Sequence, residues 1–188
     1  MSKKIFWYSI IALVFIRIIL VALLMFGVPS LGNVHFENHI PWAATGDEHY
    51  YFNVAKDFAR FHFRDEWGLR GIGTFLVYVP YIWLTGAQDR FDLFPSVFYV
   101  QAFVMYPLAI VFVGLAAKNL LKSRGAGAAA AAAFTFYPYV VYLANLGPYE
   151  HNYNHFLDAM WLRSVLSDVP SAFFVLLAVM LFALSQEK

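Results

Sequence analysis

Four apolar segments divide the chain, and each has a length close to that of a membrane-spanning helix. The first, Ile5 to Val28, has 24 residues and one charged side chain, Arg17. At 1.5 Å per residue it can cross roughly 30 Å of hydrocarbon. The other segments are residues 96–117, residues 126–146 and a shorter stretch, residues 169–185. The pattern predicts an all-α polytopic membrane protein with about four transmembrane helices in a single domain, residues 1–188.

A fifth apolar segment, Gly71 to Gly86, is shorter and contains Pro80. Counting it as a span would place the basic connection at 118–124 on the side opposite the two N-terminal lysines, against the positive-inside tendency. We therefore expect a re-entrant or interfacial segment. The predicted topology has cytoplasmic N and C termini, with exoplasmic loops at 29–95 and 147–168. This describes a multi-pass protein of a bacterial inner membrane or an equivalent membrane.

The composition agrees with this pattern and excludes some function classes. Hydrophobic residues make up 61% of the chain and charged residues 13%, and there is no cysteine. Neither a disulfide framework nor a cysteine metal site is therefore available. The net charge of +1 excludes a strong electrostatic footprint for nucleic acid. Membrane lipid is the expected surrounding partner.

Two adjacent acidic residues, Asp47 and Glu48, follow Thr45 and Gly46 in the first predicted exoplasmic loop. Thr at an N-cap and Glu three residues later form a capping box, in which each side chain accepts a hydrogen bond from a backbone donor. Capping is a sufficient role for Glu48. It explains Asp47 less well, because a first-turn aspartate favours the helix dipole but is not needed for the box.

The residues after this pair have the periodicity of an amphipathic helix. Tyr51, Val54, Phe58 and Phe61 share one face, and polar residues cover the other. We expect this juxtamembrane helix to lie on the outer membrane surface.

The second predicted exoplasmic loop contains His151 and His155, four residues apart, and Asp158 three residues further along. On a helix the three side chains would share a face, and such a set can hold Zn²⁺ or another divalent ion. The same spacing also occurs in loops that bind no metal. A divalent metal cofactor is thus one of two alternatives here.

Three further features concern the spans themselves. Asp168 precedes the last span as either a helix cap or a second site carboxylate, and Pro170 suits the first helical turn.

Arg17 is near the middle of the first span, so it should face the bundle interior and have a partner, such as a phosphate, a carboxylate or another subunit. The small residues from Gly125 to Ala133 predict a face that lets helices approach closely.

The order of these parts resembles the N-terminal region of GT-C glycosyltransferases, the membrane enzymes that use polyprenyl-phosphate sugars and include protein O-mannosyltransferases and aminoarabinose transferases. The resemblance lies in the first span with its arginine, "GDEHYYFNVAKDFA", the Pro-containing segment with "GAQDRFDLFPSVFYVQAF", and "SDVPSAFFVLLAVMLFAL". It covers nearly the whole chain in order, although each motif is short.

The resemblance implies transfer of a hexose or pentose from a polyprenyl-phosphate donor to an acceptor hydroxyl at the exoplasmic face. Asp47 would be the essential carboxylate, with Glu48 beside it and Asp168 as a second acidic position. A catalytic base must reach the hydroxyl proton, and the departing phosphate needs cations or oriented donors. Candidates for binding phosphate are Arg60, Arg64, Arg70 or a divalent metal, and candidates for lining the sugar or lipid path are Tyr50, Tyr51 and Trp42.

Members of that family are usually several times longer than 188 residues. We therefore expect either a fragment, a module completed by another membrane subunit, or a non-catalytic structural or accessory subunit of a membrane complex. A small transporter is the weaker alternative, because only the first span contains a buried charge.

Overall fold

The computed structural model describes residues 1–23, 36–37, 40–41, 46–63, 76–144 and 168–186. Most of these residues are helical. The helices are α1 (Lys3–Ala22), α3 (Gly46–Ala59), α5 (Val79–Thr85), α6 (Arg90–Val100), the π-helical turn η3 (Gln101–Met105), α7 (Tyr106–Leu120), α8 (Arg124–Ala144) and α10 (Asp168–Ser185). Two short strands, β1 (Phe36–Glu37) and β2 (Ile40–Pro41), pair antiparallel. The sequence did not predict this pair.

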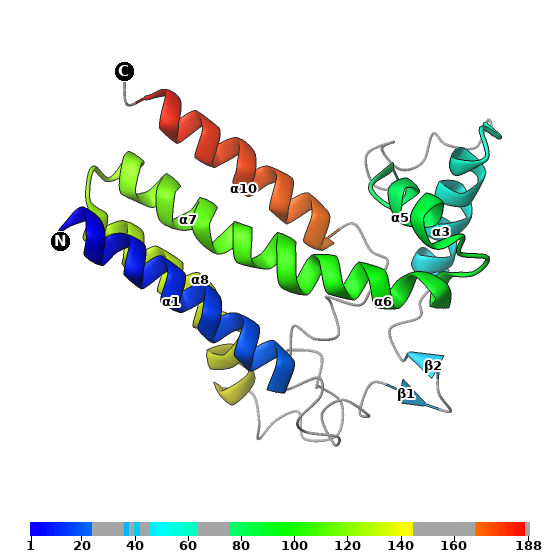
Figure 1. The fold of residues 1–188 in the computed structure, drawn as a ribbon, viewed down its shortest axis with the longest axis horizontal. Helices are drawn as coiled ribbons and strands as arrows, with labels where there is room; N and C mark the ends of the chain where they lie inside the picture. Colours follow the sequence, from blue (N-terminus) through cyan, green and yellow to red (C-terminus); the bar gives the residue numbers. More distant parts are fainter. Residues whose placement is uncertain (24–35, 38–39, 42–45, 64–75, 145–167, 187–188) are drawn as a thin grey trace.

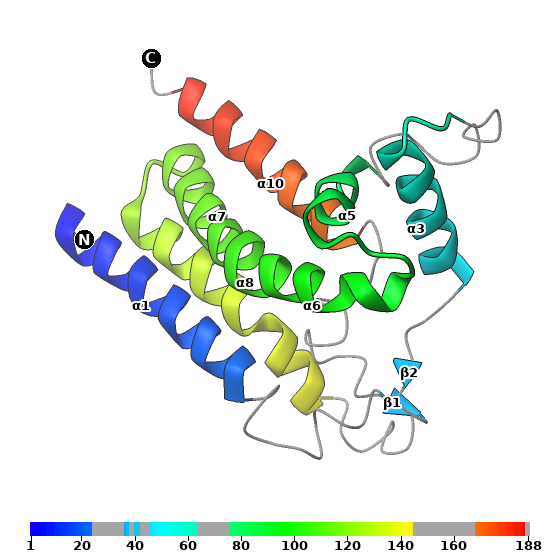
Figure 2. The same cartoon turned by 45° about the vertical axis from the view of Figure 1, so that its right-hand side comes forward.

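Four helices form a bundle in which α7 is central. It packs against α8 on one side and α10 on the other, and α1 packs against both α8 and α7. Figures 1 and 2 both place the N and C termini at one end of this bundle. At the opposite end α3 and α5 pack together beside α6, which continues through η3 into α7. We call these the terminal end and the α3 end.

Within the described ranges, two helices are long and apolar enough to cross a membrane: α1 and the continuous helix from Arg90 to Leu120. α10 is a shorter apolar helix, and α8 has 21 residues. The helices predicted at 5–28, 96–117, 126–146 and 169–185 are therefore confirmed as helices over their described parts.

The described part of the fifth apolar segment is short. α5 has seven residues, with a proline in its first turn, and it ends at Gly86, whose φ of 66° is left-handed. Glycine adopts this conformation without strain, and it terminates the helix. Seven residues span about 10 Å, which is one third of the hydrocarbon thickness. α5 is therefore too short to cross.

The long central helix contains a local irregularity at η3. Pro107 follows in the first turn of α7. Proline has no N–H, and its ring clashes with the carbonyl four residues earlier, so an uninterrupted α-helix is unfavourable here. The wider π turn accommodates the proline within a continuous helix.

The small-residue face predicted in residues 125–133 lies between α8 and α7. A Cβ added at Gly127 would be 2.5 Å from the Gly114 carbonyl oxygen and 2.8 Å from Lys118 Cβ. Ala131, one turn further along, is fully buried with Ile10 and Ile110. The close helix approach predicted from the alanine run is confirmed.

Substituting Gly127 by Ala is expected to lower the free energy of unfolding by about 1–3 kcal/mol, because the added methyl group must displace backbone of α7. Thermal unfolding in detergent, followed by tryptophan fluorescence, measures this. Gly125→Ala is the matched control: its Cβ would be 3.7 Å from Ser123 Oγ, an ordinary contact. Equal stability of the two variants would contradict close packing at Gly127.

Candidate functional site

The α3 end has its own apolar core. Tyr51, Phe52, Val54 and Ala55 of α3 pack there with buried residues of α5 and α6, including Tyr78, Ile82 and Leu93. The apolar face predicted for α3 therefore exists, but at Tyr51 and Val54 it contacts protein. The expected position of this helix on the outer membrane surface stays a prediction. Periodicity shows that a helix face is apolar and does not show what covers it.

Asp47 and Glu48 are the second and third residues of α3, which begins at Gly46. This start agrees with the helix boundary that the capping box predicted. Thr45 lies outside the described residues. Both carboxylates thus belong to the first turn, where backbone N–H groups and the positive end of the helix dipole favour negative charge.

His49, the residue after this pair, is exposed and lies within hydrogen-bond distance of Asn53, with 2.8 Å between His49 Nε2 and Asn53 Nδ2. The two side chains are one helical turn apart on the exposed face of α3. A histidine next to two carboxylates is a polar neighbour that the sequence reasoning did not consider. The i, i+4 spacing of His and Asn was the available signal.

The opposite end of α3 closes with a Schellman motif. Phe61 N–H donates to the Phe58 carbonyl at 2.9 Å, and His62 N–H donates to the Asp57 carbonyl at 2.9 Å. Phe61 adopts φ 59° at the position where glycine is usual. Its ring projects outward, 73% exposed, with its centroid 6.5 Å from that of Trp83. This end therefore presents aromatic surface.

Arg60 lies next to this motif. Its guanidinium donates to Gln88 Oε1 at 3.1 Å, and Lys56 Nζ donates to the Gln88 carbonyl. Thirteen residues of helix separate Arg60 from Asp47, which is about 20 Å along the axis. The fold does not bring Arg60 and Asp47 to one phosphate. The hydrogen bond to Gln88 links Arg60 to the connection between α5 and α6.

The two predicted tyrosines differ in exposure. Tyr51 is 5% exposed and belongs to the core of the α3 end, whereas Tyr50 is half-buried at its edge. Their rings make an edge contact with centroids 6.1 Å apart. Tyr50 is thus the more accessible of the two for a sugar or lipid. Nearby on α5, burial raises the pKa of Tyr81 to about 12, so its phenol stays protonated and neutral.

Several predicted site residues lie outside the described residues: Trp42, Arg64, Arg70, His151, His155 and Asp158. Within the described ranges there is no group of three His, Cys, Asp or Glu side chains that could hold a metal ion. The predicted divalent site remains a prediction.

Asp168 is the first residue of α10. The next residue, Val169, packs on a small apolar cluster formed by Val21 of α1 with Phe98 and Ala102 of the central helix. The start of α10 therefore contacts the region where α6 becomes η3. Because α3 contacts α6 as well, the acidic starts of α3 and α10 belong to the same end of the molecule.

Gln101, which sequence reasoning missed, lies in η3 between these elements. It is fully buried, and neither atom of its carboxamide has a hydrogen-bond partner within the described part of the chain. A buried amide in this state costs about 1–3 kcal/mol, and π turns occur often at functional sites. In the sequence, Gln101 is recognisable as the one residue with a carboxamide side chain in the apolar segment 96–117.

Arg17 is fully buried in the bundle, as predicted. Its Nη1 donates to the Tyr139 hydroxyl at 2.8 Å, and its guanidinium carbon lies 4.0 Å from the centroid of the Tyr106 ring. These two partners are aromatic residues from α8 and α7, which differ from the phosphate, carboxylate or further subunit that the sequence suggested. A ring face and a phenol oxygen both stabilise a desolvated guanidinium. The contact with the ring contributes about 2 kcal/mol.

Comparison of the chain with models of protein families, with curated proteins and with solved structures finds no match.

The Arg17 contacts predict a difference between two tyrosines of α8. Tyr139→Phe keeps the ring and removes the hydroxyl that accepts from Arg17, so the free energy of unfolding should fall by about 2 kcal/mol. Tyr137→Phe, on the same helix but 68% exposed, should change it by less than about 0.5 kcal/mol. Denaturant titration in detergent measures both. If Tyr139→Phe left the free energy of unfolding unchanged, this hydrogen bond would not stabilise the bundle.

Proposed function

We propose that the chain is a GT-C-like glycosyltransferase module that transfers a sugar from a polyprenyl-phosphate donor to an acceptor hydroxyl at the exoplasmic membrane face. The observation that carries the proposal is the common location of two acidic helix starts, Asp47 and Glu48 on α3 and Asp168 on α10, at the α3 end of the bundle. Further chain or another membrane subunit completes the donor pocket.

The proposed topology has four spans, formed by α1, the α6–η3–α7 helix, α8 and α10. Both described termini lie at one end of the bundle, as an even number of crossings requires. The basic residues Lys118, Lys122 and Arg124 lie at this terminal end, which the positive-inside rule assigns to the cytoplasm. The α3 end is then exoplasmic, and α5 is too short to alter the count.

Exposed aromatic residues support an interfacial position for α3 and α5. Phe61, Phe63 and Trp83 are each more than half exposed, and Leu84 of α5 is 86% exposed. Trp83 also donates from Nε1 to the Ala59 carbonyl at 2.8 Å, which ties the two helices together. The indole of Trp is favourable at the membrane–water boundary, and Phe and Leu are typical of the apolar face of interfacial helices. This surface would hold α3 at headgroup level, with its acidic start near the lipid-linked donor.

The chemistry assigns Asp47 the role of base. Its carboxylate takes the proton of the acceptor hydroxyl as the oxygen attacks the anomeric carbon, and the bond from that carbon to the lipid phosphate breaks. The leaving phosphate gathers negative charge and requires donors or a cation. Because Arg60 lies about 20 Å from Asp47 along α3, this role would fall to Arg70 or a divalent metal.

Asp47→Asn is expected to reduce sugar transfer by about 10²–10⁴-fold, the usual contribution of a positioned base. The assay follows transfer from a radiolabelled polyprenyl-phosphate sugar in membranes containing the full chain. Asp57→Asn is the matched control, because it makes the same chemical change near the other end of α3 and should retain transfer. Full activity of Asp47→Asn, in protein that is folded and inserted, would contradict the proposed role.

The competing function is a non-catalytic structural or accessory subunit. It is favoured by the apolar surface that α1 and α10 leave uncovered, including Phe15, Ile19 and Phe182, which are each more than half exposed. Lipid or a partner helix could cover this surface. This function predicts a stable complex that tolerates Asp47→Asn, so the same variant separates the two.

The topology makes a prediction that a chain without cysteine can test cleanly, because each introduced cysteine is the only labelled residue. His62→Cys should react with a membrane-impermeant maleimide on intact cells. Leu121→Cys and Gln186→Cys, which replace exposed residues at the terminal end, should react only after permeabilisation. Labelling of His62→Cys and Leu121→Cys from the same side would overturn the four-span arrangement.

A further inference from the structure

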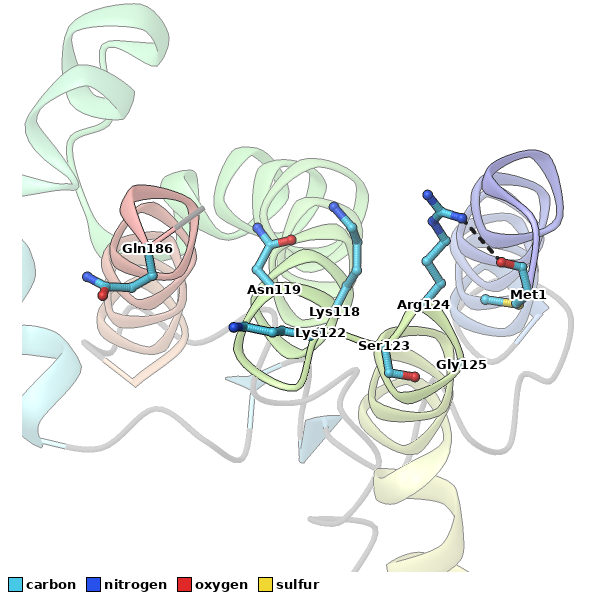
Figure 3. Close-up of a pocket in the computed structure, with 8 residues that line it drawn as sticks. All are labelled: Met1, Lys118, Asn119, Lys122, Ser123, Arg124, Gly125 and Gln186. Atoms are coloured by element: carbon cyan, nitrogen blue, oxygen red, sulfur yellow. Dashed lines mark hydrogen bonds between the residues drawn. The ribbon is translucent and has the colours of Figure 1, made fainter. Parts of the chain in front are cut away.

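A cavity of about 600 Å³ opens at the turn between α7 and α8, at the terminal end of the bundle (Figure 3). This volume is within the range of small-ligand sites, roughly 300–1,000 Å³. Lys118, Lys122 and Arg124 contribute to its wall, and none of the described residues that line it is acidic. The cavity therefore favours an anion.

Asn119 also lines the cavity, and it is the most informative residue there. Its side chain is 8% exposed, and neither its amide nitrogen nor its amide oxygen has a hydrogen-bond partner among the described residues. Figure 3 shows it beside Lys118 on the last turn of α7. A buried amide without hydrogen-bond partners lowers the free energy of unfolding by about 1–3 kcal/mol. A ligand that accepts from the nitrogen and donates to the oxygen would recover that energy.

The backbone at this turn is already satisfied. Ser123 N–H donates to the Lys118 carbonyl at 3.0 Å and Lys122 N–H donates to the Asn119 carbonyl at 3.3 Å, which is a Schellman motif with Lys122 at φ 49°. Lysines near the end of α7 also complement its dipole. That effect accounts for the positive charge of the turn, but not for the buried Asn119 amide.

The start of α8 adds to the preference for an anion. α8 begins at Arg124, and Ser123 Oγ accepts from Ala126 N–H at 3.2 Å, so the positive end of a 21-residue helix adjoins the cavity. Arg124 Nη1 donates to the Met1 carbonyl at 3.4 Å, which links the turn to the start of α1. The basic side chains, the positive end of the α8 dipole and the buried Asn119 amide therefore all adjoin the same cavity.

We infer that this cavity binds the phosphodiester of an anionic phospholipid with a hydroxylated headgroup, such as a phosphatidylglycerol. The phosphate oxygens would face the cations and accept from the Asn119 amide nitrogen, while a headgroup hydroxyl would donate to its oxygen. Leu120, 50% exposed beside the turn, offers apolar surface for acyl chains. The location in the cytoplasmic leaflet rests on the topology of the proposed function, and basic pockets there bind such lipids.

The test uses the purified full chain in uncharged detergent, with native mass spectrometry counting bound lipid at equal concentrations of phosphatidylglycerol and phosphatidylcholine. The unmodified chain should retain phosphatidylglycerol preferentially. In the double variant Lys122→Gly, Arg124→Gln this retention should fall about tenfold, because each cation contributes to anionic lipid binding. Glycine suits the left-handed position of the Schellman motif, so the variant should remain folded.

The matched control is Lys3→Gln, Lys4→Gln, which removes the same charge from residues at the same end that do not line the cavity. It should retain phosphatidylglycerol as the unmodified chain does. Asn119→Leu should lose the preference while melting at the same or a higher temperature, because it removes a buried unsatisfied amide. Equal retention of the two lipids, or an equal loss in the control, would overturn the inference.

A soluble anion is distinguished in the same experiment. Inorganic phosphate at millimolar concentration should not displace phosphatidylglycerol, and displacement would overturn the assignment to lipid. Binding in detergent requires neither sugar transfer nor membrane orientation. Failure to bind phosphatidylglycerol would therefore not contradict the glycosyltransferase proposal. Absence of sugar transfer would likewise not contradict lipid binding.

Discussion

The close approach of α7 and α8 at Gly114 and Gly127 is the contact on which most of the bundle depends. There is no space for a Cβ at Gly127, so the two backbones meet directly. This contact places α8 where Tyr139 reaches Arg17 of α1, and it sets the tight turn that forms the terminal cavity. With α8 held on one side of α7, α10 packs on the other. Such packing by small residues is effective in an apolar solvent, where hydrophobic burial between helices gains little.

Three of the buried polar side chains in the bundle differ in what surrounds them. Arg17 is compensated within the chain by the Tyr106 ring and the Tyr139 hydroxyl. Gln101 and Asn119 are buried with no hydrogen-bond partner for their amides among the residues described. A buried polar group without a partner costs free energy, so its presence calls for an explanation. For Arg17 that explanation is structural. Gln101 lies within the α6–η3–α7 helix, directly after α6, and Asn119 lies in its last turn, where we propose lipid binding.

The acidic starts of α3 and α10 and the basic turn between α7 and α8 lie at opposite ends of the bundle, and the α3 end also contains Lys56 and Arg60. Asp47, Glu48 and Asp168 begin helices at the α3 end, whereas Lys118, Lys122 and Arg124 surround the turn at the terminal end. This separation suits a protein with a reactive exoplasmic face and a cytoplasmic face held to anionic lipid. The helices between the two ends are apolar on their outer surfaces, as the exposed side chains of α1 and α10 illustrate. The two proposals therefore concern different ends of one bundle and can fail independently.

The sequence by itself determined the helices of the bundle, the burial of Arg17 and the close packing at the alanine run, because length, periodicity and the cost of a buried charge are local properties. It also predicted that α3 starts after Thr45. Only the tertiary structure decided that the apolar face of α3 packs on α5 and α6, that Arg17 meets tyrosines, and that Arg60 reaches Gln88. It also revealed Gln101 and Asn119 as buried amides. These facts depend on which element covers which, and hydrophobic pattern alone does not contain that information.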